Sequence, residues 1–217
     1  MNTVIFDNDG LLIDSERIIH RALLWAGETM GLADMKSTAL AMVGRTQASA
    51  RALCAEKYGA DFDYDRLCDL KHEYIDGVLP DGYFPARYGA LETARRLKES
   101  GFHIAVASSS RRGYVEEELK HTGLYDLFEV ILCGDNVTKS KPDPQIFLIA
   151  AERLGVSPAD CYVLEDSCNG IRAAHAAGMK PIMVPDLLPP DDEMKRLAVF
   201  IADDLTAAGE YILGQNP

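Results

Sequence analysis

Short apolar runs recur along the chain, and they predict the buried strands of a sheet that is covered on both faces. Such runs are found at residues 3–6, 103–107, 130–133, 161–164 and 181–184. Between the later runs, amphipathic patterns predict helices at residues 89–100, 113–121, 144–154 and 171–177. Strands that alternate with single helices imply right-handed crossovers between parallel strands. The pattern therefore predicts an α/β fold with a parallel sheet.

The segment after the first strand has a different pattern. It offers only amphipathic helices, at residues 15–30, 46–58 and 63–79. We therefore expect a helical domain at residues 14–80, inserted into a core made of residues 1–13 and 81–217. A chain of 217 residues is long enough for such a core and a small insert.

Composition and charge narrow the range of partners. The chain has a formal net charge of -12, and its Lys and Arg residues are scattered rather than gathered into a stripe that could follow nucleic-acid phosphates. An anionic ligand would therefore need cations supplied by its own site. No apolar run approaches the roughly 20 residues of a membrane helix, and no basic and apolar leader opens the chain. We expect a cytoplasmic monomer that binds neither nucleic acid nor a membrane.

Chemically active side chains follow four of the predicted strands. Because the carboxyl ends of parallel strands face one crevice, we expect these side chains to meet there. They are Asp7 and Asp9 after the first run, Ser108 after the second, Lys141 beyond the third, and Glu165 and Asp166 after the fourth. This set offers a nucleophile, an acid or base, a hydroxyl donor, a fixed cation and oxygen ligands for a hard metal. Such a combination is typical of phosphoryl transfer.

Two of these carboxylates suit the covalent chemistry. Asp7 is the candidate nucleophile, which would form an aspartyl phosphate and so split hydrolysis into two easier steps. Asp9 stands two residues further along, where it can protonate the leaving alcohol and later take a proton from water. We therefore predict different roles for the two acids.

The remaining residues suit the control of charge. Asp166, helped by Glu165, is the natural partner of Asp7 for Mg²⁺, a cation that prefers octahedral coordination by oxygen. Lys141 adds a fixed positive charge, and Ser108 offers a donor to a phosphoryl oxygen. The predicted site thus contains the local cations that an acidic chain requires.

These residues resemble the motifs of the haloacid dehalogenase-like (HAD) superfamily, in particular the branch that contains β-phosphoglucomutase and many sugar phosphatases. The match spans nearly the whole chain and rests on four motifs in order: DNDG with DSE at residues 7–10 and 14–16, VASSS at 106–110, SKPDP at 140–144 and LEDSCNGI at 164–171. Asp-x-Asp-Gly alone is often only a polar turn, but four motifs in order are highly specific. The resemblance implies a Rossmann-like three-layer αβα core and a small helical cap that closes over the substrate.

The resemblance also implies roles for individual residues. Mg²⁺ would be held by the side chains of Asp7 and Asp166 and by the carbonyl of Asp9, with Glu165 joining directly or through water. The superfamily's dehalogenases lack the second aspartate of the first motif, so Asp9 implies phosphate chemistry. Asn8 replaces the usual apolar residue between the two acids, and the sequence explains no role for it.

Three further residues are candidate substrate contacts. Ser109 follows Ser108, although Ser109 or Ser110 could simply cap the next helix. Arg45 stands where related caps place residues that touch the substrate, and His20 lies on the first helix of the insert. Both residue types are more often ordinary surface or half-buried side chains.

The sequence leaves two enzyme functions open, and a residue of the helical insert helps to distinguish them. The first is a Mg²⁺-dependent phosphatase, a phosphoric monoester hydrolase acting on a small phosphorylated metabolite such as a sugar or polyol phosphate. The alternative is a β-phosphoglucomutase-type mutase. In β-phosphoglucomutase a histidine of the first cap helix couples closure to catalysis. Counting without gaps from the Asp-x-Asp motif, the equivalent position in this sequence is Ile19. His20 is one residue further on, which turns its side chain by about 100° around the helix. This favours the phosphatase. The intact set of polar residues disfavours a non-catalytic binding module.

Overall fold

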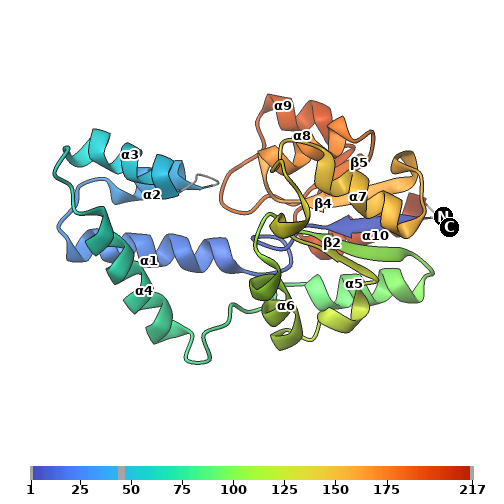
Figure 1. Cartoon of the computed structure of the whole chain (residues 1–217), viewed down its shortest axis with the longest axis horizontal. Coiled ribbons are helices and arrows are strands. Elements are labelled where there is room, and N and C mark those ends of the chain that lie inside the picture. Colours follow the sequence, from blue (N-terminus) through green and yellow to red (C-terminus); the bar gives the residue numbers. More distant parts are fainter. Residues whose placement is uncertain (1, 44–46, 216–217) are drawn as a thin grey trace. The chain divides into compact units, whose positions relative to one another are not determined.

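The chain forms two compact units. The computed structural model describes residues 2–43 and 47–215. One unit consists of Met1–Asp14 and Pro85–Pro217, and the other of Ser15–Phe84 (Figure 1). Each unit has its own hydrophobic core. We describe the units separately, and the role of the second as a cap stays a prediction.

The first unit is built on one parallel sheet with the strand order β3-β2-β1-β4-β5-β6. Its strands are β1 (Thr3–Phe6), β2 (His103–Ala107), β3 (Val130–Leu132), β4 (Cys161–Glu165), β5 (Lys180–Met183) and β6 (Phe200–Ile201). Strands β1 and β4 are buried at every position, as expected for continuous apolar runs. The predicted parallel α/β core is therefore confirmed. The two-residue β6 was not predicted.

The register of the central strands aligns their carboxyl ends. Phe6 pairs with Val106 of β2 and with Leu164 of β4. Just beyond, the Asp7 amide donates to the carbonyl of Leu164 at 3.0 Å. Ladder bonds of this kind hold the residues after each strand at one edge of the sheet.

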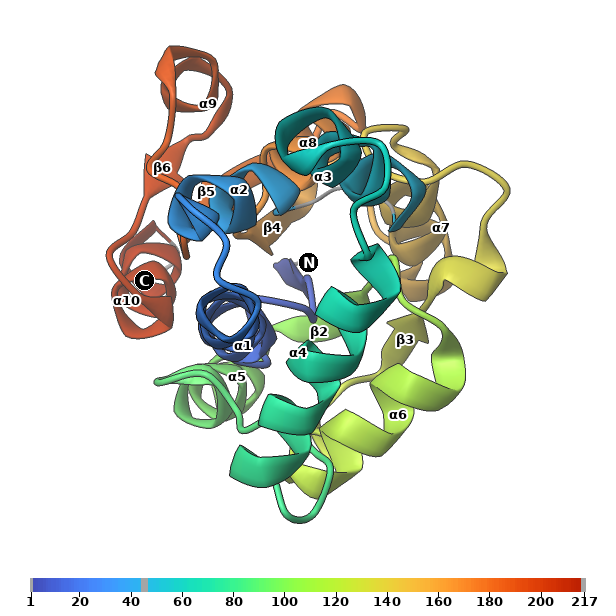
Figure 2. The same cartoon turned by 90° about the vertical axis from the view of Figure 1, so that its left-hand side faces the viewer.

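Helices cover both faces of this sheet. They are α5 (Ala90–Glu99), α6 (Arg112–His121), α7 (Gln145–Leu154), α8 (Cys168–Ala176), α9 (Asp192–Leu197) and α10 (Leu205–Gln215), with 3-10 turns at Tyr125–Leu127, Gly134–Asn136 and Pro158–Asp160. Figures 1 and 2 show α7 and α8 on one side of the sheet and α5 and α6 on the other. On the first side, Phe147 of α7 packs among strand residues such as Ile5 and Val163. The core therefore has the three layers that were predicted.

The second unit is helical in its described part. It contains α1 (Ser15–Thr29), α2 (Met35–Met42), α3 (Gln47–Tyr58) and α4 (Tyr64–Val78). Leu23, Ala26 and Leu67 are among the residues of its buried core. Helix α4 begins with a predictable cap, since the Asp63 side chain accepts from the Arg66 amide at 2.9 Å. Helix α2 was not predicted, because it has only eight residues and no side-chain cap at its start.

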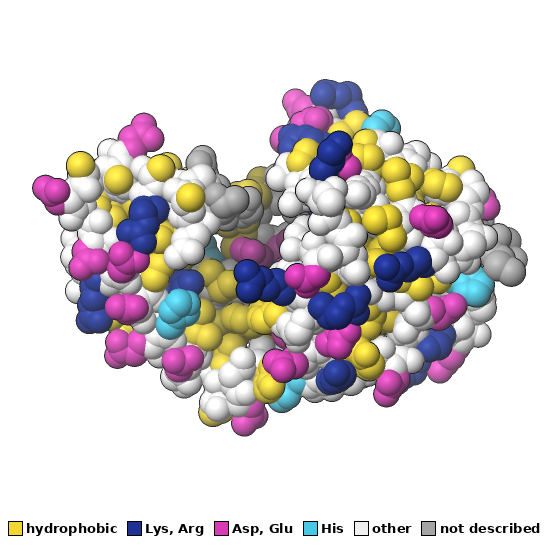
Figure 3. Space-filling view, viewed as in Figure 1, with side chains coloured by type: hydrophobic (Ala, Val, Ile, Leu, Met, Phe, Trp, Pro, Cys, Tyr) yellow, Lys and Arg dark blue, Asp and Glu magenta, His cyan; other side chains and the backbone are white. Residues whose placement is uncertain are grey.

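Charged side chains of both signs are interspersed over the face of the molecule drawn in Figure 3. Some form pairs on one helix or turn, as Arg112 does with Glu116 at 2.8 Å and Lys139 with Asp143 at 3.4 Å. Exposed pairs of this kind contribute about 0–1 kcal/mol each. In the described parts of the chain, no helix is long and apolar enough to cross a membrane.

Candidate active site

The Lys141 ammonium group joins three segments at the carboxyl edge of the sheet. It donates to Asp7 Oδ1 and to Glu165 Oε1, each at 2.6 Å, and to the carbonyl of Ala107 at 2.9 Å. Its side chain is almost fully buried. Burial opposes the positive charge, but the two carboxylates prevail and raise the pKa of Lys141, so the group stays protonated. Lys141 therefore ties together the ends of β1, β2 and β4.

Both carboxylate oxygens of Glu165 have partners. Oε1 accepts from Lys141, and Oε2 accepts from the amide and the hydroxyl of Ser167 at 3.0 and 2.8 Å. Gly170, in the first turn of α8, makes room for this arrangement, because a Cβ there would lie 1.8 Å from the carboxyl carbon of Glu165. The part of Glu165 in holding a metal, directly or through water, stays a prediction.

Asp9 has different surroundings from Asp7. Its Oδ2 accepts from the hydroxyls of Ser108 and Ser110 at 3.0 and 2.9 Å. The Ser108 hydroxyl itself accepts from the Ser110 amide at 2.9 Å. Asp9 is half-buried, whereas Asp7 is 7% exposed and faces the ammonium group. Two acids from one strand end are thus held by different chemical groups.

Ser110 is a site residue that the sequence interpretation missed. Helix α6 begins after Arg111, which makes no side-chain cap hydrogen bond, so the prediction that Ser109 or Ser110 caps this helix is wrong. Ser109, the predicted substrate contact, is exposed, and its contact with substrate stays a prediction. A serine hydroxyl can accept from the backbone amide two residues on, and Ser108 does so in the bend at Ser109 and Ser110. The run of three serines was therefore the available signal.

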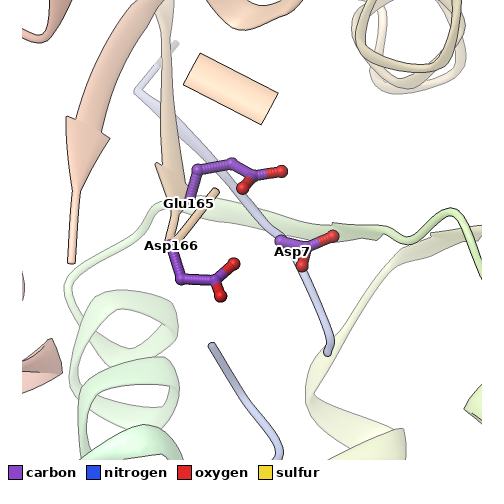
Figure 4. Close-up of side chains that lie close together, drawn as sticks. All are labelled: Asp7, Glu165 and Asp166. Atoms are coloured by element: carbon purple, nitrogen blue, oxygen red, sulfur yellow. The ribbon is translucent and has the colours of Figure 1, made fainter. Parts of the chain in front are cut away.

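Three carboxylates converge at the ends of β1 and β4 (Figure 4). Asp7, Glu165 and Asp166 offer oxygen atoms that all lie within 4.8 Å of one another. Burial raises the pKa of Asp7 to about 8, with the charges of Glu165 and Asp9 acting in the same direction and Lys141 opposing them. One ammonium group cannot balance these carboxylates, so the cluster favours a further cation. An oxygen-rich cluster suits a hard divalent metal.

Two predicted substrate contacts belong to the insert. His20 lies in α1 and is half-buried, and burial, together with the charge of Lys36, lowers its pKa. Its Nε2 is buried without a hydrogen-bond partner in the described structure. Arg45 lies outside the described residues. Both contacts stay predictions.

The parallel sheet of this αβα core carries two aspartates and a buried lysine at its carboxyl edge. This set suits one class of protein, the enzymes of phosphoryl transfer. Comparison with known proteins narrows this class. Residues 4–184 match the family described as haloacid dehalogenase-like hydrolase. The chain therefore belongs to the haloacid dehalogenase-like hydrolases, and it is a phosphoric monoester hydrolase. Enzymes of this family use a divalent metal.

Individual relatives agree with this assignment. YhcW of Bacillus subtilis is 37% identical over 222 residues, covering 100% of both chains. The fructose-1-phosphate phosphatase YqaB of Escherichia coli is 33% identical over 185 residues, covering 83% of this chain and 95% of its own. The crystal structure of a HAD family hydrolase from Deinococcus radiodurans with bound phosphate and sodium is 30% identical, with a TM-score of 0.76, and covers 95% of this chain and 92% of its own.

Proposed function

We propose that the protein is a Mg²⁺-dependent phosphatase that hydrolyses a small sugar or polyol phosphate through an aspartyl-phosphate intermediate. The observation that carries this proposal is the contrast between two neighbouring acids: Asp7 is paired with an ammonium group, and Asp9 with two hydroxyls. A nucleophile and a proton-transfer group need such different surroundings.

In the first step, Asp7 attacks the phosphorus of the substrate. A carboxylate oxygen of Asp7 forms the new bond to phosphorus, while Lys141 donates to Oδ1 and keeps positive charge beside the group. The bond between phosphorus and the leaving oxygen breaks, and Asp9 donates a proton to that oxygen. The serine hydroxyls hold Asp9 in place while this proton moves.

In the second step, water attacks the phosphorus of the aspartyl phosphate. Asp9 takes a proton from this water, the bond between Asp7 and phosphorus breaks, and phosphate leaves. Asp7 and Asp166 would hold Mg²⁺, which supplies positive charge for the phosphoryl oxygens when it is bound. Lys141 contributes a fixed positive charge at the same edge of the sheet.

The substrate class rests on the name of one relative. YqaB, a relative that matches most of the chain, is named for fructose 1-phosphate. The chain carries a net charge of -12, so its cationic site would be the main attraction for a small anion. A cytoplasmic location and a monomeric state stay predictions.

The test is an assay of phosphate release in Mg²⁺ from an aryl phosphate and from a panel of sugar, polyol and nucleotide phosphates. We expect release from one or more sugar or polyol phosphates and its loss in Asp7→Asn. The matched control is Asp203→Asn, at an exposed position of the unit that contains the sheet, and this variant should keep full activity. Phosphate release that persists in Asp7→Asn would overturn the proposed nucleophile.

The same assay separates a phosphatase from a mutase. β-Glucose 1-phosphate is supplied, and glucose 6-phosphate and free phosphate are measured together. A phosphatase releases phosphate faster than it forms glucose 6-phosphate. The opposite order would show that the phosphoryl group passes to a sugar hydroxyl, and the proposed hydrolysis would be wrong.

A further inference from the structure

Asn8, the polar residue between the two acids, is fully buried and contacts a carboxyl group from a distant element. Its Nδ2 donates to Glu118 Oε2 at 3.0 Å. Glu118 lies in α6 and is only 1% exposed. A buried acid beneath the first motif is unexpected, because most glutamates lie at the surface.

The other two oxygen atoms of this pair have no hydrogen-bond partner. Asn8 Oδ1 and Glu118 Oε1 are both buried, and neither receives a hydrogen bond in the described structure. A buried polar atom without a partner destabilises the folded state, because it has lost its hydrogen bonds to water. Both atoms are acceptors while the carboxyl is ionised, so they cannot bond to each other. A single proton on Glu118 would satisfy both.

We propose that Asn8 and Glu118 form a reciprocal pair, in which the amide donates to one carboxyl oxygen and the protonated carboxyl donates back to the amide oxygen. Glu118 is then a positioning residue, which acts on Asp7 and Asp9 through Asn8. An amide and a carboxylic acid have the complementary donors and acceptors that such a pair needs.

The surroundings of Glu118 favour the protonated form. Burial raises the pKa of this carboxyl to about 7, and the negative charge of Asp9 acts in the same direction. The hydroxyl of Tyr114, one turn earlier in α6, and the amide of Asn8 act in the opposite direction. Burial prevails, so the carboxyl keeps its proton well above the pH at which an exposed glutamate loses it.

The pair matters to the site because Asn8 stands between the two acids and opens the turn that contains Asp9. The Asn8 carbonyl accepts the backbone amides of Leu11, Leu12 and Ile13 at 3.3, 2.9 and 3.0 Å. Because the Asn8 side chain is hydrogen-bonded to Glu118 of α6, the first residue of this turn is held in place. Gly10, in this turn, has a φ of 76°, a conformation that glycine adopts without strain. Small shifts of such a turn would misplace the two acids.

The test compares two substitutions of Glu118, and its kinetic arm rests on the proposed phosphatase function. In Glu118→Gln, the new amide accepts from Asn8 Nδ2 and donates to Asn8 Oδ1, so we expect kcat and KM within about threefold of wild type. In Glu118→Leu both bonds are lost. We expect kcat to fall by about 10- to 100-fold, with KM little changed, because misplacement of catalytic groups has effects of this size.

Two further variants complete the experiment. Glu117→Leu, at the exposed neighbouring position of α6, is the matched control and should leave kcat unchanged. The double variant Asn8→Leu/Glu118→Leu should lose no more of kcat than the more impaired single variant, because the pair acts as a unit. A fall in Glu118→Gln as large as that in Glu118→Leu would overturn the reciprocal pair. Full activity in Glu118→Leu would overturn the positioning role.

An infrared measurement tests the pair independently of activity. The C=O stretch of a protonated carboxylic acid should appear in the difference spectrum between wild type and Glu118→Gln at about pH 6, below the raised pKa. Its presence in a protein without phosphatase activity would support the pair while refuting the proposed function. Its absence would overturn the pair, whatever the activity.

Discussion

At the scale of single residues, the two aspartates of the site differ in their hydrogen-bond partners. Asp7 has an ammonium partner at 2.6 Å, and Asp9 has two serine hydroxyls at 2.9 and 3.0 Å. The first environment suits a carboxylate that must approach an anionic phosphate. The second suits the proton-transfer role proposed for Asp9. The order of the two acids in the sequence does not contain this distinction.

The role of Asp9 predicts a dependence on the leaving group. In Asp9→Asn, hydrolysis of an alkyl phosphate should fall by about 10²- to 10⁴-fold, the usual contribution of a general acid. A phenolic leaving group needs less protonation, so aryl phosphate should lose much less. Rates for both substrates with wild type and variant provide the measurement. Equal losses on the two substrates would count against Asp9 as the acid.

The hydrogen bond from Ser110 to Asp9 predicts a smaller effect on kcat. Ser110→Ala removes one of the two hydroxyl donors to Asp9, and a hydrogen bond to a charged group contributes about 1.5 kcal/mol, so kcat should fall by about tenfold. Ser100→Ala is the matched control, because Ser100 is exposed and lies at the end of α5. An equal loss in both serine variants would show that the hydrogen bond to Asp9 is not the cause.

The residues that escaped sequence interpretation share a physical reason. Glu118 stands in a run of three glutamates, and such a run is typical of a solvated helix face. Only its spacing from Val115, which is three residues away and buried, places it on the inner side of α6. The partner, Asn8, is 110 residues away, and no local pattern reports a pairing over that distance.

At the scale of elements, the first turn of α8 packs against the carboxyl group of Glu165. Gly170 has no space for a side chain, because a Cβ would overlap the Glu165 carboxylate. Helix α8 can therefore approach β4 closely only with glycine at this position. The close approach lets Ser167 and Lys141 share the same carboxylate.

This packing predicts that Gly170→Ala is destabilising although alanine favours helices. The variant should lose about 1–3 kcal/mol of unfolding free energy, the typical cost of overpacking, and should also lose kcat because Glu165 must move. Gly113→Ala in α6 is the control, since its Cβ would meet nothing within 4 Å and should be neutral or stabilising. Denaturant unfolding of both variants provides the measurement. A stable Gly170→Ala protein would contradict the close contact.

Elements were predictable where the pattern was continuous. The runs for β1 and β2 match the observed strands residue for residue, because strands buried on both faces read as uninterrupted apolar segments. Strand β6 has only two half-buried residues, which is too short for any periodicity. Helix α2 has only eight residues, and its N-cap, Asp34, has a φ of 54° and makes no side-chain capping bond. A helix this short carries too few residues for a clear helical period.

At the scale of the whole molecule, bound metal should stabilise the fold, because it offsets repulsion among buried carboxylates. At a Mg²⁺ concentration about 100 times its Kd, the gain is about 2.7 kcal/mol, and the unfolding midpoint should rise. A chelator should abolish both the rise and the activity, and added Mg²⁺ should restore them.

Variants locate the metal that causes this stabilisation. Asp166→Asn should lose most of the rise in the unfolding midpoint, while Asp203→Asn, at an exposed position, should keep it. Calorimetry or dye-monitored unfolding with and without Mg²⁺ provides the measurement. An undiminished rise in Asp166→Asn would place the metal elsewhere.

The pH dependence of the free energy of unfolding should also show whether Glu118 is protonated in the folded chain. Unfolded glutamate loses its proton near its ordinary pKa of 4.5, whereas burial raises the pKa in the folded chain to about 7. Between these pH values unfolding releases a proton, so a rise in pH favours the unfolded state. Wild type should therefore lose stability relative to Glu118→Gln as the pH rises through this range. A pH-independent difference between the two proteins would contradict the raised pKa.

The chain leaves the core and returns to it at neighbouring points. The Asp14 amide donates to the carbonyl of Pro85 at 2.9 Å, and the Arg87 amide donates to the carbonyl of Leu12 at 2.8 Å. Between them, Ile13 forms an antiparallel bridge with Ala86. The core thus holds both ends of residues 15–84 without their help. This makes the insertion a separable block: one contiguous stretch of the gene encodes it, and replacing that stretch would leave the hydrogen bonds at the junction in place.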